Sequence, residues 1–176
     1  MKPRVYLAGG MSGLTPQGAL AWRDRAAFAL NDRGIETLSP MRGHPAEVQN
    51  SELPIQPFDD VAVAGGPEGV ILRDLTDVRR ADALLVSVLG NERISVGTAM
   101  ELAWAYLLHI PAVVAIEKTG NPHDDHPMVR AAMRYRADAR SALAGTGFNV
   151  PAVRRASGAS HWACHGGRFG APTGHA

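Results

Sequence analysis

The chain has 176 residues, of which 45% are hydrophobic, 20% charged and 6% aromatic, a composition typical of one folded domain and unlike that of a fibrous or disordered chain. The formal net charge of +1 is uneven, because residues 145–176 carry three arginines and no acid, which leaves 15 basic against 17 acidic side chains in residues 1–144. Such a charge balance disfavours a nucleic-acid polymer as partner, whereas a single nucleotide needs only a few local donors.

A membrane protein and a disulfide scaffold are also disfavoured. No apolar run approaches the roughly 18 residues of a membrane-spanning helix, and residues 1–4 lead into a strand-like segment without a signal-peptide pattern. The single cysteine, Cys164, cannot form an internal disulfide. We therefore expect a cytoplasmic protein with no membrane partner.

The first predicted strand covers residues 4–8 and ends in a glycine-rich turn at residues 9–13, where backbone amides can approach a ligand closely. A helix should follow, with Thr15 as its N-cap and Gly34 just after its end. Residues 35–38 then predict a second short strand.

Residues 39–69 contain five prolines and hold no period for long. They predict a long loop, with room for a short helix. Because long loops in compact domains are usually functional or disordered, this segment is a candidate lid or pocket wall.

The pattern becomes regular again at residues 70–72, which predict a strand, and a short helix is expected to begin at Asp74. Two further strands (83–89 and 112–116) and two further helices (97–109 and 127–133) follow. Strands that are apolar on both faces need helices on both sides. The sequence therefore predicts an α/β fold: a single Rossmann-like, doubly wound parallel sheet of about five strands in residues 1–144, followed by a flexible Gly/Pro/His-rich tail at 145–176.

Ligands of such sheets bind outside the carboxyl ends of the strands. The turn at residues 9–13 does not match GxGxxG, and no acid ends the second strand, so a nicotinamide dinucleotide is disfavoured. Asp74 is expected just after a strand, where the common use of an aspartate is as a helix N-cap. Asp77, one turn later, is expected to complement the helix dipole.

Glu101 is the main candidate for chemistry. It is expected in about the first turn of a helix that opens at Gly97, among apolar neighbours that leave it little water. There the helix dipole should help the carboxylate to stay ionised at neutral pH, and the carboxylate could attack an electrophilic sugar carbon. Tyr6, on the first strand, could orient it by a hydrogen bond. A surface glutamate and a core tyrosine are the plainer alternatives.

Three motifs in this order and spacing resemble the nucleoside 2-deoxyribosyltransferase family, which includes the 2'-deoxynucleoside 5'-monophosphate N-hydrolases. They are VYLAGG at 5–10, DL at 74–75 followed after six residues by DALLV at 82–86, and SVGTAMELAWA at 95–105. The resemblance implies that Glu101 is a nucleophile that attacks C1' and forms a glycosyl ester. It further implies that Tyr6 holds this carboxylate and that Asp74 contacts the nucleobase and helps to protonate it, as in retaining glycosidases.

The resemblance also bears on the substrate. The residue six before the nucleophile is typically aspartate in the transferases and serine near the 5'-phosphate in the hydrolases, and here it is Ser95. With Gly9, Gly10 and Ser12 as an anion-binding nest and Gly97 beside it, Ser95 favours a phosphorylated substrate. Ser12 stands where the hydrolases often have an arginine, and Ser95 could equally be a helix cap.

In this family neighbouring subunits complete one another's sites. The segment around His126 resembles the part that reaches across, so we expect a homodimer or higher homo-oligomer in which His126 donates to the partner's substrate; a surface histidine is the alternative. We expect no cofactor and no metal ion, because the chemistry needs neither. The tail residues His161, Cys164 and His165 lack the spaced pairs of a metal site.

The sequence thus predicts an enzyme that cleaves the N-glycosidic bond of a small deoxynucleoside or its 5'-monophosphate, by hydrolysis or base exchange. A non-catalytic nucleotide-binding sensor of the same fold is one alternative. A cytokinin-type phosphoribohydrolase is another, although its proline-glycine-glycine run before the Gly-Thr pair is missing.

Overall fold

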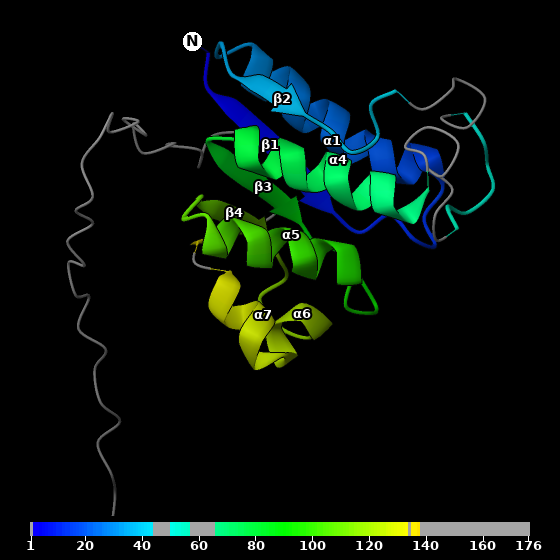
Figure 1. Ribbon diagram of the computed structural model, residues 1–176. Coiled ribbons are helices and arrows are strands. Elements are labelled where there is room, and N and C mark those ends of the chain that lie inside the picture. The colour runs from blue at the N-terminus through cyan, green and yellow to red at the C-terminus, as the bar shows by residue number, and fades with distance from the viewer. Residues whose placement is uncertain (1, 44–49, 57–65, 134, 138–176) are drawn as a thin grey trace, which may run out of the picture.

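A five-stranded, all-parallel sheet lies between helices in the computed structural model, which describes residues 2–43, 50–56, 66–133 and 135–137 (Figure 1). The strands are β1 (Arg4–Gly9), β2 (Glu36–Leu38), β3 (Ala83–Ser87), β4 (Ala112–Ala115) and β5 (Tyr135–Ala137). Their order in space is β2-β1-β3-β4-β5, and every neighbouring pair is parallel. The predicted doubly wound sheet is confirmed.

The helices divide between the two faces of the sheet according to the direction of each crossover. The chain runs from β1 outward to β2 through α1 (Pro16–Asn31), and then turns back across β1 to reach β3, β4 and β5. Right-handed crossovers in opposite directions place helices on opposite faces. The helices that follow this reversal are α4 (Pro67–Arg80), α5 (Val96–Leu107), α6 (Pro122–Asp125) and α7 (Pro127–Ala132). The strand order reverses between β1 and β3, which is the place where doubly wound sheets bind ligands.

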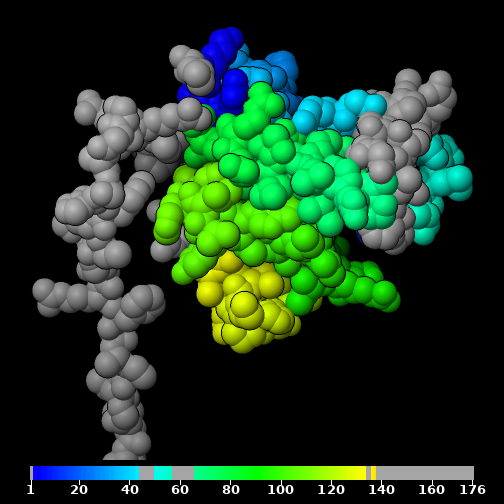
Figure 2. All heavy atoms as spheres, in the orientation of Figure 1, coloured from blue at the N-terminus to red at the C-terminus, as the bar shows by residue number. Residues whose placement is uncertain are grey.

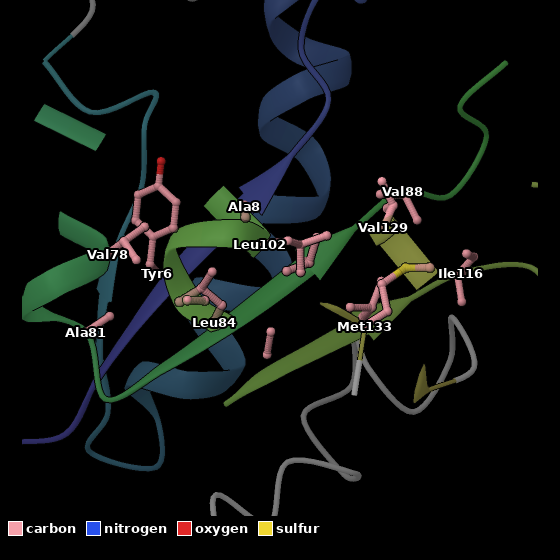
Figure 3. Close-up of a cluster of buried hydrophobic side chains, with 14 of the residues drawn as sticks. Tyr6, Ala8, Val78, Ala81, Leu84, Val88, Leu102, Ile116, Val129 and Met133 are labelled. Atoms are coloured by element: carbon pink, nitrogen blue, oxygen red, sulfur yellow. The ribbon is translucent and has the colours of Figure 1, made fainter. Parts of the chain in front are cut away.

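Each face of the sheet carries its own hydrophobic core. Because side chains alternate along a strand, Val5 and Leu7 point to the α1 side, whereas Tyr6 and Ala8 point to the side of α4, α5 and α7. The second cluster is the larger, and Figure 3 shows Tyr6 in it together with Leu84, Leu102 and Val129. The side chain of Tyr6 therefore lies on the side of the sheet that α4 and α5 cover. The position between β1 and β3 where the strand order reverses is called the switch point below.

The first helix begins as predicted. Thr15 is the N-cap of α1, and its Oγ1 accepts a hydrogen bond from the Gly18 amide at 3.1 Å. Gly34, after the helix, has a φ of +75°, a conformation that suits glycine. The strand predicted at 35–38 is β2, and the helix predicted at 127–133 is α7.

The strand predicted at residues 70–72 is wrong, because these residues lie inside α4, which begins at Pro67. Proline at the first position of a helix is favourable, and it starts α4 before the apolar run. Ile71 and Leu72 are exposed, whereas the buried positions of the helix include Asp74 and Val78. Polar side chains at inward positions concealed the helical period.

The fifth strand is instead β5, which the sequence pattern did not indicate. It has three residues and pairs only with β4 among the described strands. Such a short edge strand offers too few positions for a period of two to be recognised. The short helix α6 was also missed, because its four residues make only about one helical turn and show no helical period.

Asp77 does not complement the dipole of a first helical turn. It lies in the third turn of α4, buried, and forms an ion pair with Arg42 in the segment after β2. This pair fastens the start of the long 39–69 segment to α4. In the same segment, Ile55 exchanges backbone hydrogen bonds with the turn after β1: its N–H donates to Leu14 O at 2.6 Å, and its carbonyl accepts from Gly13 N–H at 2.9 Å.

Other parts of that segment (44–49 and 57–65) lie outside the described residues, as does the tail at 145–176. Among the helices of the described ranges, none is long and apolar enough to cross a bilayer.

Candidate active site

Three elements bring the three predicted catalytic residues to the α4–α5 side of β1. Tyr6 comes from β1, Asp74 from α4 and Glu101 from α5. The Tyr6 hydroxyl donates a hydrogen bond of 2.7 Å to Glu101 Oε1, and this contact is buried. Glu101 is 7% exposed and Asp74 9% exposed. The predicted pairing of Tyr6 with Glu101 is therefore confirmed as a contact.

Tyr6 reaches the site from the middle of β1. It is the third residue of a six-residue strand and lies opposite Leu84 of β3. Figure 3 shows its ring in the hydrophobic cluster beside Val78, with the hydroxyl directed out of the cluster. The apolar ring anchors the side chain, and its length carries the hydroxyl to Glu101.

Glu101 occupies an inward position of α5. The helix begins at Val96 after the N-cap Ser95, so Glu101 lies in its second turn, not its first. It shares the buried face with Thr98, Leu102 and Ala105, at the three- and four-residue spacing of a helix stripe. The sequence singled out Glu101 by its apolar neighbours along the chain and by the motif around it, not by this stripe.

Burial raises the pKa of Glu101 from its usual 4.5 to about 8. The hydrogen bond from Tyr6 lowers this pKa, the negative charge of Asp74 raises it, and the cations Arg23 and Arg73 lower it. Burial thus opposes the ionised form that was expected at neutral pH, and Glu101 lies in the second turn of α5, beyond the first turn where the helix dipole acts most strongly. At pH 7 about a tenth of Glu101 is ionised if its pKa is about 8.

Tyr6 remains a hydrogen-bond donor throughout this range. Burial raises its pKa well above 10, and the negative charges of Glu101 and Asp74 raise it further. The phenol proton therefore stays on Tyr6 and points at the carboxylate, whichever state Glu101 is in.

Asp74 is not a helix N-cap, because it lies eight positions into α4, on the helix face that packs toward β1 and α5. Its Oδ1 accepts a hydrogen bond of 3.1 Å from Nε of Arg73, the preceding residue. The charge of Asp74 acts on both Glu101 and Tyr6, so the three groups form one electrostatic unit.

Arg23, which the sequence analysis missed, is a buried cation on the other side of β1. It is 1% exposed, and its guanidinium donates to the carbonyls of Leu7, Gly9 and Ala19 at 3.3, 2.9 and 2.6 Å. Burial lowers its pKa to about 10, so it stays charged at neutral pH, where it opposes the rise in the pKa of Glu101.

A sequence signal for Arg23 does exist. It interrupts the inward stripe of α1 formed by Ala19, Ala26 and Leu30, at the same spacing at which Glu101 interrupts the stripe of α5. An arginine at a core position must find acceptors, and the carbonyls at the end of β1 provide them.

The glycine turn after β1 packs against the end of β3 and the loop that follows it. A side chain at Gly9 would come within 2.6 Å of the Ser87 carbonyl, and one at Gly10 within 2.8 Å of Asn91 Nδ2. Glycine therefore allows the ends of β1 and β3 to approach each other closely. Ser12, which follows in this turn, is exposed.

Ser95 is the N-cap of α5, the alternative that the sequence left open. Its Oγ accepts hydrogen bonds from the amide and the hydroxyl of Thr98 at 3.3 and 3.0 Å. Gly97 is exposed in the first turn of this helix, and His126 is exposed between α6 and α7.

Within the described part of the chain, no group of three or more His, Cys, Asp or Glu side chains could hold a metal ion. His161, Cys164 and His165 lie outside the described residues.

Fold and site together define a doubly wound α/β protein with a buried carboxylate, bound by a tyrosine hydroxyl, at the point where the strand order reverses. The model of the nucleoside 2-deoxyribosyltransferase family matches residues 5–150, and the chain belongs to this family. No curated protein shows a significant match to the chain. This match confirms the resemblance drawn from the three motifs. The family is generally enzymatic and acts on small nucleosides.

Proposed function

We propose that the protein cleaves the N-glycosidic bond of a deoxynucleoside or deoxynucleoside 5'-monophosphate through a covalent glycosyl ester of Glu101. The observation that carries this proposal is the buried 2.7 Å hydrogen bond from Tyr6 to Glu101, with the charge of Asp74 acting on both groups. A protein that only binds nucleotides has no need of a desolvated carboxylate held in this way.

The chemistry follows the logic of a retaining glycosidase. A Glu101 oxygen forms a bond to C1' while the bond from C1' to the base nitrogen breaks, and the bonding electrons leave with the base. Asp74 contacts the departing base and relays a proton to it from a solvent water, so that Asp74 is a carboxylate before and after the step. Water or a second base then attacks C1', releases Glu101 and gives net retention. Tyr6 holds the attacking carboxylate in one orientation throughout.

The substrate assignment favours a 5'-monophosphate. The supporting features are the glycine turn at 9–13 and the capped N-terminus of α5, both next to the switch point. Backbone amides at such places favour an anion. The Ser95 hydroxyl oxygen accepts two hydrogen bonds from Thr98, which leaves its O–H to donate to a further acceptor such as a phosphate oxygen.

The test is to incubate the protein with a panel of nucleosides and 5'-monophosphates, with and without an acceptor base, and to identify the products chromatographically. Free base and deoxyribose 5-phosphate would mean a hydrolase, and a new nucleoside would mean a transferase. Saturable binding without any release of base would overturn the proposal in favour of a sensor.

We also propose that two or more copies associate through the side of the molecule formed by α4, α5 and α7, which Figure 2 displays. Large exposed apolar side chains lie on all three helices: Leu72 (63%), Val96 (72%), Leu107 (74%) and Met128 (78%). His126, beside Met128, would then reach the partner's site. Sedimentation should show a dimer or larger assembly at micromolar concentration, and a monomer would contradict this.

The pH dependence of kcat/KM should follow the ionisation of Glu101. Because the nucleophile is the deprotonated form, kcat/KM should rise as pH increases and level off above the Glu101 pKa of about 8. The slope below that value should approach tenfold per pH unit. Steady-state kinetics with one substrate between about pH 6 and about pH 9 measures this rising part of the profile, which is called the pH limb below. A kcat/KM that is flat or falls over this range would be inconsistent with a buried Glu101 nucleophile.

Tyr6→Phe should weaken catalysis and move the same limb. The variant keeps the buried ring but removes the donor that lowers the pKa of Glu101, so the limb should shift to higher pH. We expect kcat/KM to fall by about tenfold to hundredfold, the range for one hydrogen bond to a charged group. The pH profile of the variant measures both effects, and an unshifted limb would show that the Tyr6 hydroxyl does not act on Glu101.

A further inference from the structure

A buried histidine outside the catalytic group fixes the end of the loop between β3 and α5. His123, in α6, is 0% exposed, and its Nε2 accepts a hydrogen bond of 3.0 Å from the backbone N–H of Ser95. Its Nδ1 lies 3.0 Å from Oδ1 of Asn121. The ring therefore spans the space between the loop after β4 and the N-cap of α5.

The partners of Asn121 assign the tautomer of this ring. The Asn121 Nδ2 group donates to Val88 O at 2.8 Å and to Glu117 Oε2 at 2.7 Å, and Oδ1 accepts from the His123 backbone N–H at 3.0 Å. Oδ1 is thus the acceptor side of the amide, so the ring proton belongs on Nδ1 and Nε2 is the acceptor. Only the neutral ring satisfies both contacts.

Both ends of the β3–α5 loop are tied to the segment from Glu117 to His123. Near the start, Glu117 Oε1 accepts from the Gly90 N–H at 2.6 Å, and Asn121 binds Val88 O. At the far end, His123 binds the Ser95 N–H. Asn91, in this loop, lies against Gly10 of the glycine turn. The loop therefore has a fixed course along the switch point.

We propose that His123 is a positioning residue: by accepting the Ser95 amide it sets the start of α5 and hence the place of Glu101 opposite Tyr6. His123 forms its hydrogen bonds with Ser95 and Asn121 and not with Glu101 or Asp74, so it acts through Ser95 and the helix. The catalytic consequence of this role rests on the proposed function, whereas the placement of α5 does not.

A first experiment needs no activity. Nitrogen NMR of the His123 ring in the parent protein at neutral pH should show the Nδ1–H tautomer with an unprotonated Nε2. Amide hydrogen exchange in His123→Leu should show lost protection at Ser95 and retained protection at Val86 in the sheet, and His123→Gln, which keeps an acceptor, should restore Ser95. A ring protonated on Nε2, or equal Ser95 protection in all three proteins, would overturn the proposal.

A second experiment measures the catalytic consequence. His123→Leu should lower kcat/KM by about tenfold to hundredfold, because a misplacement of about 1 Å can cost about a hundredfold. It should also shift the pH limb of Glu101 upward, since the bond from Tyr6 is weakened; a simple loss of folded protein would leave the limb in place. His123→Gln should recover most of the rate.

The matched control is His109→Gln. His109 is exposed and lies between the end of α5 and the start of β4, so its replacement should leave kcat/KM and its pH limb unchanged. An unshifted limb in His123→Leu would count against the positioning role. If the parent protein releases no base from any substrate, the proposed function fails, and the tautomer and the Ser95 exchange still decide the role of His123. If His123→Leu does not fold, the tautomer of the parent and the exchange of His123→Gln decide it.

Discussion

Glu101→Gln is expected to lower the rate of base release by about ten-thousandfold or more, because an amide cannot form the glycosyl ester and removal of a nucleophile is among the costliest changes to an enzyme. Glutamine has nearly the same shape, and its amide oxygen can still accept the hydrogen bond from Tyr6. The fold should therefore survive. Single-turnover assays with the best substrate of the panel measure the loss, and base release at the parent rate would exclude Glu101 as the nucleophile.

The same variant has a stability signature that serves as its folding control. In the parent, the folded-state pKa of Glu101 is raised to about 8, above its usual 4.5, so between these values the folded state holds a proton that the unfolded state has released. The free energy of unfolding should therefore fall as pH rises through this window, by up to about 1.4 kcal/mol per pH unit. Glu101→Gln should lose this contribution, which denaturant titrations at several pH values can measure.

Asp74→Asn should lower kcat by about a hundredfold to ten-thousandfold with natural bases, the range expected for loss of a general acid. The loss should be much smaller for a substrate whose base leaves without needing a proton. Asparagine can still accept the hydrogen bond from Arg73, so the local structure should persist. Rate measurements with substrates of differing leaving-group pKa test this, and an equal loss for all of them would contradict an acid role for Asp74.

Asp77→Asn is the matched control. Asp77 is also a buried aspartate of α4, three residues further on, but it pairs with Arg42. Its replacement should lower stability through the lost ion pair and leave the leaving-group dependence of the folded enzyme unchanged. The comparison separates a requirement for Asp74 from a general requirement for buried charge in this helix.

Much of the fold could be predicted because its elements carry local signals. The Thr15 cap fixes α1, and the continuous apolar runs of β3 and β4 indicate buried parallel strands. The errors fall where the tertiary structure overrides those signals. Ile71 and Leu72 are apolar but exposed in α4, while the inward positions of that helix include Asp74 and Asp77.

The candidate site was predictable in its members but not in its electrostatics. Tyr6, Asp74 and Glu101 could be identified from motifs, whereas the raised pKa of Glu101 depends on how completely three elements exclude water from it. Arg23 and His123 were missed because they bind backbone groups of distant segments: the carbonyls of β1 for Arg23 and the Ser95 amide for His123. The stripe of α1 indicates that Arg23 is buried, but no spacing in the sequence shows which distant groups a buried side chain binds.

The most direct test of the central claim is to trap the intermediate. A substrate with fluorine at C2' slows both steps through an oxocarbenium-like transition state, and a poor acceptor lets the ester accumulate. Mass spectrometry of the quenched protein should show one added sugar per active site, on the peptide that contains Glu101. Turnover of such a substrate with no covalent adduct, or with the sugar on another residue, would contradict the mechanism.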